Sequence, residues 1–256
     1  MDDFEEKRLR VREGTARIDA DGMHYRTLNS LMKSLSGSGV KKIELHNVCG
    51  QRYIGTGLGN LTIEVHGTPG SDLGAFMKGP NVIVCGNAQD GCGNTMDEGK
   101  IVIHGHAGDI VGYSMRGGSI FIRDDVGYRV GIHMKEYQDK VPAIVVGGTA
   151  QDFLGEYMAG GVLVVLGLTL SDSLEHNARF VGTGMHGGKM YVRGKVKNPA
   201  DDVEVTDLDE DDNKLLYSLV SEFCSCFNFD KDAIMAQRFS KLVPISKRPY
   251  GKLYAV

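Results

Sequence analysis

The sequence contains little of what marks secreted, membrane-spanning or redox-active proteins. Its 256 residues include six prolines and five cysteines, and no two cysteines form a C-x-x-C pair. No run of about 18 apolar residues occurs, so the sequence predicts no membrane span. The amino terminus is highly charged and lacks the apolar stretch of a signal peptide. Together these absences predict a reduced, cytoplasmic protein.

An excess of charge of one sign is also missing. The formal net charge is −4, which gives no indication of nucleic-acid binding. No P-loop, G-x-S-x-G or zinc motif is present, and the many G-x-G words do not open the strand–turn–helix unit that binds a dinucleotide. Cys224 and Cys226 lie two residues apart on a predicted helix, where their side chains diverge. The sequence therefore predicts no catalytic residue and no cofactor on this chain.

Glycine, by contrast, is abundant, and it marks a repeat of nineteen residues. The 35 glycines are about twice the usual share of roughly 7%. The word G-x-x-M recurs along the chain, with leucine in its last place at Leu58. Its glycines are Gly55, Gly74, Gly93, Gly112, Gly131, Gly155 and Gly182, and its methionines are Met77, Met96, Met115, Met134, Met158 and Met185. We expect these glycines to form corners with positive φ and the methionines to pack inside.

Each repeat also carries a short strand rich in β-branched residues. Residues i and i+2 of a strand share a face, so two columns are predicted to point inward. The columns are Ile63, Val82, Ile101, Ile120, Ile144, Leu163 and Met190, and Val65, Val84, Ile103, Ile122, Val146, Val165 and Val192. Coils of about twenty residues, stacked roughly 4.8 Å apart, describe a parallel β-helix. The predicted fold is an all-β solenoid of about seven coils over residues 55–198.

Residues 1–54 precede the regular repeat and are expected to form a small α/β cap with an imperfect first coil. The patterns at 16–20 and 23–26 predict two short strands joined by the Asp21–Gly22 turn. Helical spacing of the apolar residues in 27–35 predicts a helix.

The middle residue of each strand triplet is predicted to point outward, and these residues form a largely apolar stripe. They are Glu64, Ile83, Val102, Phe121, Val145, Val164 and Tyr191. Such a stripe is expected to be covered. Residues 199–256 can supply the cover, because an acidic stretch is followed by one predicted helix over 215–227 and a second that carries Ile234, Met235, Phe239 and Leu242. A partner protein on the stripe is the alternative.

Two insertions break the period, at 135–142 and 168–175. Insertions in solenoids form loops that often face partners, although tolerated loop length explains them equally simply.

One outward column, directly after the strand triplets, is the candidate for a metal site. It reads His66, Cys85, His104 and Arg123, with neighbours about 5 Å apart, near enough for histidine and cysteine to share zinc. No fourth ligand is evident, so the sequence predicts no metal, and His66, Cys85 and His104 remain only a candidate set. The other turn histidines are predicted to be ordinary surface or hydrogen-bonded residues: His106, His133 and His186.

Two longer words carry a family resemblance. Gly155–Gly167 (GEYMAGGVLVVLG) and Gly182–Val192 (GTGMHGGKMYV) resemble the carboxy-terminal β-helix domain, called GXGXG, of the glutamate synthase large subunit. Asn47–Leu58 and Phe239–Pro244 are similar to the flanks of that domain. The resemblance implies a right-handed β-helix in an enzyme that makes glutamate from glutamine and 2-oxoglutarate. In that family the β-helix is a scaffold between a glutaminase and an FMN and iron–sulfur synthase barrel.

This chain also departs from that family. It begins Met-Asp-Asp, whereas the glutaminase relies on an amino-terminal cysteine nucleophile, and it has neither the cysteine cluster of an iron–sulfur centre nor the length of a barrel. No catalytic residue is carried over. The resemblance implies a stand-alone, non-catalytic subunit of a split glutamate synthase. Its partners would be a glutaminase and an FMN-dependent synthase that holds the FMN and iron–sulfur clusters. A homo-oligomer is compatible with the sequence.

Other assemblies contain similar chains. N-methylglutamate synthase has such a subunit, and formylmethanofuran dehydrogenase has a related β-helix subunit that Ala107–Asp109 and Met115–Gly118 would suit. An independent solenoid enzyme is a third possibility. Acyltransferase β-helices, however, use a six-residue period, of which nineteen is not a multiple.

Overall fold

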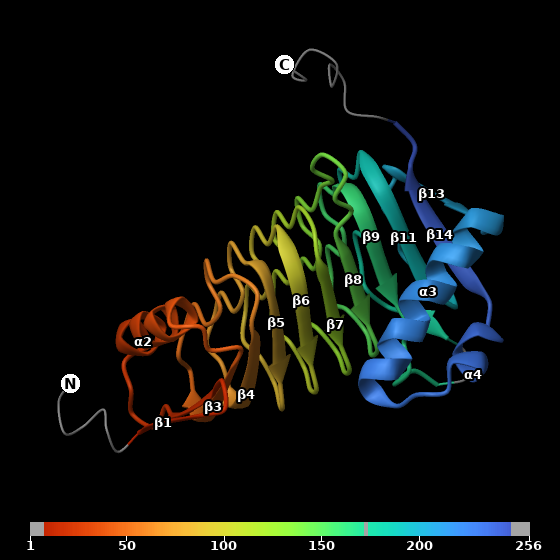
Figure 1. The fold of residues 1–256 in the computed structure, drawn as a ribbon. Helices are drawn as coiled ribbons and strands as arrows, with labels where there is room; N and C mark the ends of the chain where they lie inside the picture. The colour runs from red at the N-terminus through yellow and green to blue at the C-terminus, as the bar shows by residue number, and fades with distance from the viewer. Residues whose placement is uncertain (1–7, 172–173, 247–256) are drawn as a thin grey trace, which may run out of the picture.

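The chain winds into a parallel β-solenoid (Figure 1). The structure, a computed structural model, describes residues 8–171 and 174–246. Nine parallel strands of the described chain stack in one sheet: β2 (Thr15–Asp19), β3 (Lys42–Cys49), β4 (Thr62–Thr68), β5 (Lys78–Val84), β6 (Glu98–Ile103), β7 (Ser119–Ile122), β8 (Ala143–Val146), β9 (Ala159–Val165) and β11 (Gly187–Arg193). The predicted solenoid is confirmed, and β2 and β3 extend the stack beyond the seven predicted coils. The segment boundaries after residues 54 and 198 stay predictions.

The core of the solenoid is the stack of inward columns predicted from the repeat. Every member of both columns is buried, and the strands pair in register so that each residue lies beside its counterpart in the next coil. Ile43 and Leu45 of β3 continue the columns, followed by Ala16 and Ile18 of β2. The six repeat methionines are also buried and pack in the same apolar cluster.

At Gly112 the repeat glycine is favoured by space as well as by backbone angle. In one turn, Ile110, Gly112 and Ser114 all have positive φ, at 51°, 68° and 53°. Ile110 and Ser114 are half-buried and keep their side chains at this angle. A Cβ on Gly112 would lie 2.3 Å from Cδ1 of Ile144, too close unless this buried side chain moves within the core. Glycine is therefore favoured at the position where the turn presses against the inward column.

The amino-terminal end is closed by a hairpin and a helix. β1 (Leu9–Arg12) pairs antiparallel with β2, and α2 (Tyr25–Gly37) buries Leu28, Met32 and Leu35 against the end of the core. The strand predicted at 23–26 is wrong. The ring of His24 accepts a hydrogen bond from the backbone N–H of Arg26 and caps the helix, so the Asp21–Gly22 turn leads into α2.

The carboxy-terminal end is closed by antiparallel strands. β14 (Phe239–Pro244) pairs with β11, and β13 (Val203–Thr206) pairs with β14. α3 (Glu210–Phe227) and α4 (Lys231–Met235) connect these two strands, while β10 (Glu175–His176) and β12 (Lys195–Val196) form a separate two-stranded sheet. The second predicted helix is too long. Phe239 and Leu242 belong to β14, because the open edge of β11 offers unpaired backbone groups that a strand can satisfy.

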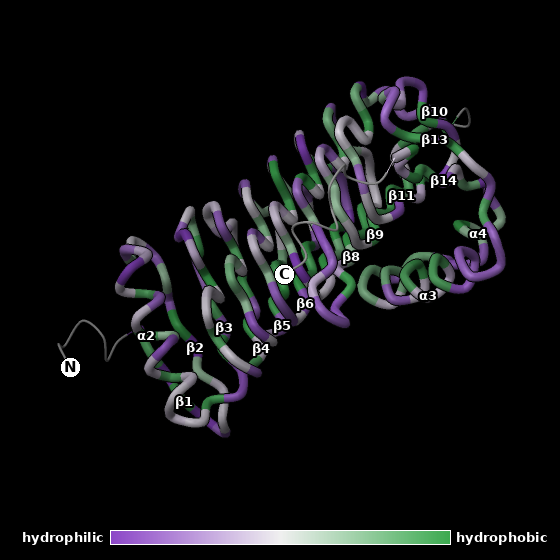
Figure 2. Tube along the Cα trace, turned by 90° about the horizontal axis from the view of Figure 1, so that it is seen from above, coloured by the Kyte–Doolittle hydropathy of each residue, from purple (hydrophilic) through white to green (hydrophobic). Residues whose placement is uncertain are grey.

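Helix α3 covers the outward stripe over the carboxy-terminal coils. The buried cluster beneath it contains Phe121, Val145, Val164 and Tyr191 of the sheet and Leu216, Val220 and Phe223 of the helix. In the view of Figure 2, α3 runs beside β8 and β9, and β3 to β5 have no helix of the described chain over this face. Within the described residues, no helix is long and apolar enough to cross a membrane.

A matched pair of substitutions separates the two demands on the turn. We expect Gly112→Ala to lower the free energy of unfolding by about 2–4 kcal/mol, from the left-handed backbone and the clash with Ile144 together. Gly57→Ala adds a Cβ at a similar left-handed angle, φ 65°, where no other atom lies within 4 Å, and should cost only about 1–2 kcal/mol. Urea denaturation of both variants measures the difference, and equal losses would contradict the spatial argument.

Candidate functional site

The turns that contain G-x-x-M form one long edge of the solenoid, and large apolar side chains project from it. Within each turn the backbone at the positions two before and two after the glycine is also left-handed. Because the glycine faces the core, these flanking positions can carry exposed side chains. The exposed aromatic residues on this turn face are Phe76, Tyr113, Tyr128, Tyr157 and Phe180.

The coil spacing arranges the aromatic residues of the turn face into two ladders. In one, Tyr113 meets the His133 ring edge-on at 6.0 Å between centroids, and His133 stacks on Tyr157 at 5.3 Å. In the other, Phe153 stacks on Phe180 at 4.9 Å. The guanidinium of Arg129 lies 4.8 Å from the Phe153 centroid and pairs with Glu156 at 2.8 Å. Continuous aromatic ladders with a cation above them are features of binding surfaces.

An open groove of about 740 Å³ lies along the first ladder. Its walls include Tyr113, His133 and Tyr157 together with the cations Arg116 and Lys135. The groove borders the first insertion, where Tyr137 and Lys140 form a small antiparallel bridge. The second insertion lies partly outside the described residues, at 172–173. The groove thus combines aromatic area with two cations and the carboxylate of Asp202.

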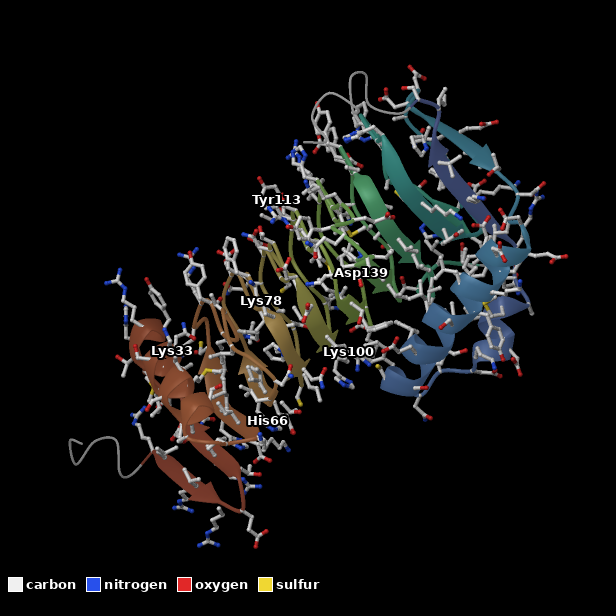
Figure 3. The ribbon with its side chains drawn as sticks, turned by 45° about the horizontal axis from the view of Figure 1, so that its top comes forward. Lys33, His66, Lys78, Lys100, Tyr113 and Asp139 are labelled. Atoms are coloured by element: carbon white, nitrogen blue, oxygen red, sulfur yellow. The ribbon has the colours of Figure 1, made fainter. Side chains whose placement is uncertain are left out.

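The predicted histidine and cysteine column lies toward the other edge of the sheet, as the labels of Tyr113 and His66 show in Figure 3. The structure brings His66 and Cys85 together but adds Glu64 to them, with the ligand atoms of these three residues all within 4.8 Å of one another. His104 does not belong to this group. Its ring packs edge-on against Phe227 at the end of α3, at 5.1 Å between centroids.

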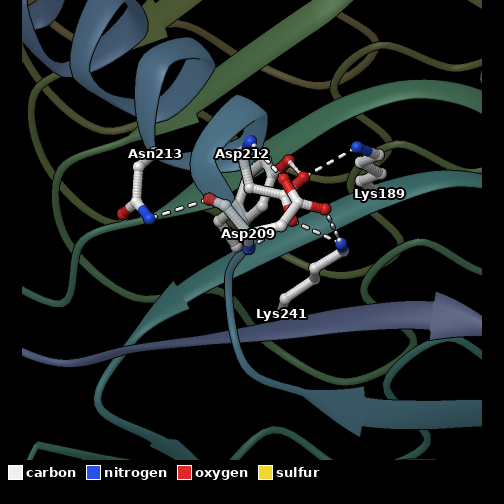
Figure 4. Close-up of polar contacts among 6 residues, drawn as sticks. Lys189, Asp209, Asp212, Asn213 and Lys241 are labelled. Carbon is white, nitrogen blue, oxygen red and sulfur yellow. Dashed lines mark hydrogen bonds and ion pairs between the residues drawn. The ribbon is translucent and has the colours of Figure 1, made fainter.

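A third cluster of charged groups lies where α3 meets the sheet, around the buried Asp212 (Figure 4). Asp212 is fully buried and accepts hydrogen bonds from Lys189 at 2.7 Å, Tyr191 at 2.6 Å and Lys241. It also completes a capping box with Asp209 at the start of α3. Burial alone would raise the pKa of Asp212, but these hydrogen bonds outweigh it and hold the pKa well below its usual range. The cluster fixes the helix to β11 and β14.

Comparison with known proteins assigns the sequence to a family. Over residues 41–246 the sequence matches the family described as GXGXG motif. The chain belongs to this family. It is 50% identical over 248 residues to the uncharacterized protein MJ1350 of Methanocaldococcus jannaschii. The matched region covers 93% of this chain and 95% of that protein.

A solved structure shares the GXGXG chain's fold. It is a chain of the formyltransferase/hydrolase complex (FhcABCD) from Methylorubrum extorquens, solved in complex with methylofuran. The TM-score is 0.63 with 20% identity, over 91% of this chain and 92% of that chain. At this identity the likeness shows the fold.

The turn face of this GXGXG protein was not predicted from the sequence. His133 and His186 were predicted to be ordinary surface or hydrogen-bonded residues; His186 does contact the carbonyl of Gly184 at 3.0 Å, and both histidines line the groove. A signal was present. Aligning the turns by their glycines places His133 and Tyr157 two residues after Gly131 and Gly155. The first insertion conceals this column from a strict nineteen-residue period.

The Asp212 cluster makes stability depend on pH. A carboxylate with a depressed folded pKa stabilises the fold above its unfolded pKa, near 3.8, and this contribution is lost as the pH falls through the folded value. We expect Asp212→Asn to lower the free energy of unfolding by about 2–3 kcal/mol at neutral pH. Between about pH 5 and pH 2, the melting temperature of this variant should fall less than that of the wild type. Thermal melts across this range check both effects. Asp211→Asn, an exposed neighbour, should behave as wild type.

Proposed function

We propose that this chain is a non-catalytic scaffold subunit of a split glutamate synthase, the assembly that forms glutamate from glutamine and 2-oxoglutarate. The observation that carries the proposal is the turn face, where aromatic side chains are held in solvent along one edge of a rigid solenoid. Exposed patches of this kind on an otherwise polar surface mark protein–protein contact. Tyrosine, phenylalanine and arginine are residues that interfaces favour.

The family supports the same proposal. The GXGXG match covers the repeat together with both flanks from which the resemblance to glutamate synthase was drawn. In glutamate synthase the corresponding domain lies between catalytic modules. We infer that a glutaminase chain and an FMN-dependent synthase chain, which carries the iron–sulfur clusters, bind this subunit. The turn face and its groove are our proposed contact for one of them.

A second candidate is favoured by the solved structure. The similar chain belongs to a formyltransferase/hydrolase complex, and the words Ala107–Asp109 and Met115–Gly118 suit a related subunit. In that case the same turn face would bind different partners. An N-methylglutamate synthase-like assembly is a further variant. The identity of the bound chains distinguishes these possibilities.

A pair of tyrosine substitutions tests the turn face. Tyr157→Glu places a charge on the first ladder, whereas Tyr217→Glu changes a tyrosine of equal exposure on α3, with exposed fractions of 46% and 48%. We expect Tyr157→Glu to weaken binding to co-expressed glutaminase and synthase chains about ten-fold or more, with an unchanged melting temperature. Calorimetry or co-purification with mass spectrometry measures this. Equal effects of the two substitutions would contradict the proposed surface.

Reconstitution tests the scaffold role itself. The purified chain should be colourless, and it should form no glutamate and hydrolyse no glutamine alone. Glutamate formation should require the glutaminase and synthase chains and should fall when this chain is left out. Turnover by the isolated chain would refute the scaffold role, and recovery of formyltransferase-type partners would favour the second candidate.

A further inference from the structure

The sheet face near the amino-terminal end carries a ladder of histidine, cysteine and glutamate side chains that the scaffold role does not use. His46 of β3, His66 of β4 and Cys85 after β5 occupy equivalent places in successive coils. Glu44 and Glu64 form a second column two residues earlier, paired across β3 and β4. Because neighbouring strands are about 4.8 Å apart, donor atoms from two coils can reach one ion.

Three of these side chains converge. The Nε2 atom of His66 lies 2.8 Å from Oε1 of Glu64, and the thiol of Cys85 completes a group whose ligand atoms lie within 4.8 Å of one another. A tetrahedral zinc site needs ligand atoms about 3.5 Å apart, which follows from bond lengths of about 2.0–2.3 Å. Small rotations of these exposed or half-buried side chains would bring the ligand atoms, now within 4.8 Å of one another, to that separation. We propose that Glu64, His66 and Cys85 bind a divalent transition metal of the zinc class.

The donor set determines the class of metal. An imidazole nitrogen, a thiolate and one carboxylate oxygen suit Zn²⁺ and chemically similar ions. Mg²⁺ and Ca²⁺ require sites built mainly from oxygen and are excluded by the same donors. Three protein ligands leave one coordination position open to water. This part of the sheet is not covered by α3, so the open position faces solvent.

Neighbouring residues already orient two of the ligands. Lys42 holds the other carboxylate oxygen of Glu64 at 2.8 Å and also contacts Glu44 at 2.7 Å. The rings of His46 and His66 are stacked, with 4.6 Å between centroids and 3° between planes. Partners of this kind fix ligand orientation in metal sites, and their loss typically weakens binding about 10- to 100-fold.

The same contacts already give Glu64 and His66 polar partners without a metal, so these two residues alone do not indicate a metal site. The thiol of Cys85 differs. Within the described chain it has no hydrogen-bond partner, although it lies beside a histidine and a carboxylate at the surface. On metal binding the thiol releases its proton to solvent and the thiolate binds the ion. The Glu64–His66 hydrogen bond is then replaced by bonds from both residues to the ion.

The test uses the full chain without a histidine tag, kept reduced. Zn²⁺ titration by calorimetry should give one site per chain, and Co²⁺ should produce the charge-transfer absorption of a cobalt–thiolate bond. Cys85→Ser and His66→Gln should each weaken Zn²⁺ binding by at least about 100-fold, more than the loss of an orienting partner. Zn²⁺ should raise the melting temperature of the wild type and not that of Cys85→Ser. Mg²⁺ should do neither.

Two matched controls decide whether the site is specific. Cys49→Ser removes another exposed thiol, and His104→Gln removes the histidine that the sequence column included but that packs on Phe227. Both should bind Zn²⁺ as the wild type does. Absence of stoichiometric binding, or equal binding by wild type and Cys85→Ser, overturns the proposal. Melting temperatures measured without metal identify any variant that is misfolded. If Cys85→Ser is misfolded, Zn²⁺ binding by His66→Gln tests the site instead. None of these outcomes depends on the proposed glutamate synthase role.

Discussion

The structure depends on the close approach of each turn to the core strands. A turn reaches the inward column only where glycine replaces a side chain, as at Gly112 beside Ile144. That contact lets the methionine of G-x-x-M pack in the same core cluster as the inward columns. Stacking these units in register then produces the long columns of identical environment that define the fold. Strand pairing sets the spacing between coils, and the glycine contact lets the turn side of the core fill at that spacing.

Coil spacing also explains why the residues of both candidate surfaces lie in ladders. The register that aligns Val65 with Val84 equally aligns outward residues, so one favourable side chain is reinforced by its counterpart in the next coil. Aromatic stacking on the turn face and the histidine pair on the sheet both arise this way. The solenoid thus converts a repeat in sequence into extended surfaces of uniform chemistry.

The fold was largely predictable because its information is periodic. Columns such as Ile63 to Met190 follow from the strand alternation and the nineteen-residue spacing, once the two insertions before Ile144 and Met190 are allowed for. The ends were not predictable in the same way. Phe239 and Leu242 fit helical spacing, but the unpaired edge of β11 decides their structure. Likewise, the sequence column included His104 as a candidate ligand. In the structure the His104 ring packs against Phe227 at the end of α3, and Glu64 instead lies beside His66.

The antiparallel strands at both ends of the described sheet have a consequence for assembly. A stack of parallel coils could in principle continue into a second molecule, coil upon coil, and grow into a fibre. β1 reverses direction at one end, and β14 and β13 reverse direction at the other. The edges presented to a neighbour therefore do not repeat the coil geometry of the interior. The solenoid is given a finite length, and its long faces are left as the surfaces on which other proteins can be arranged.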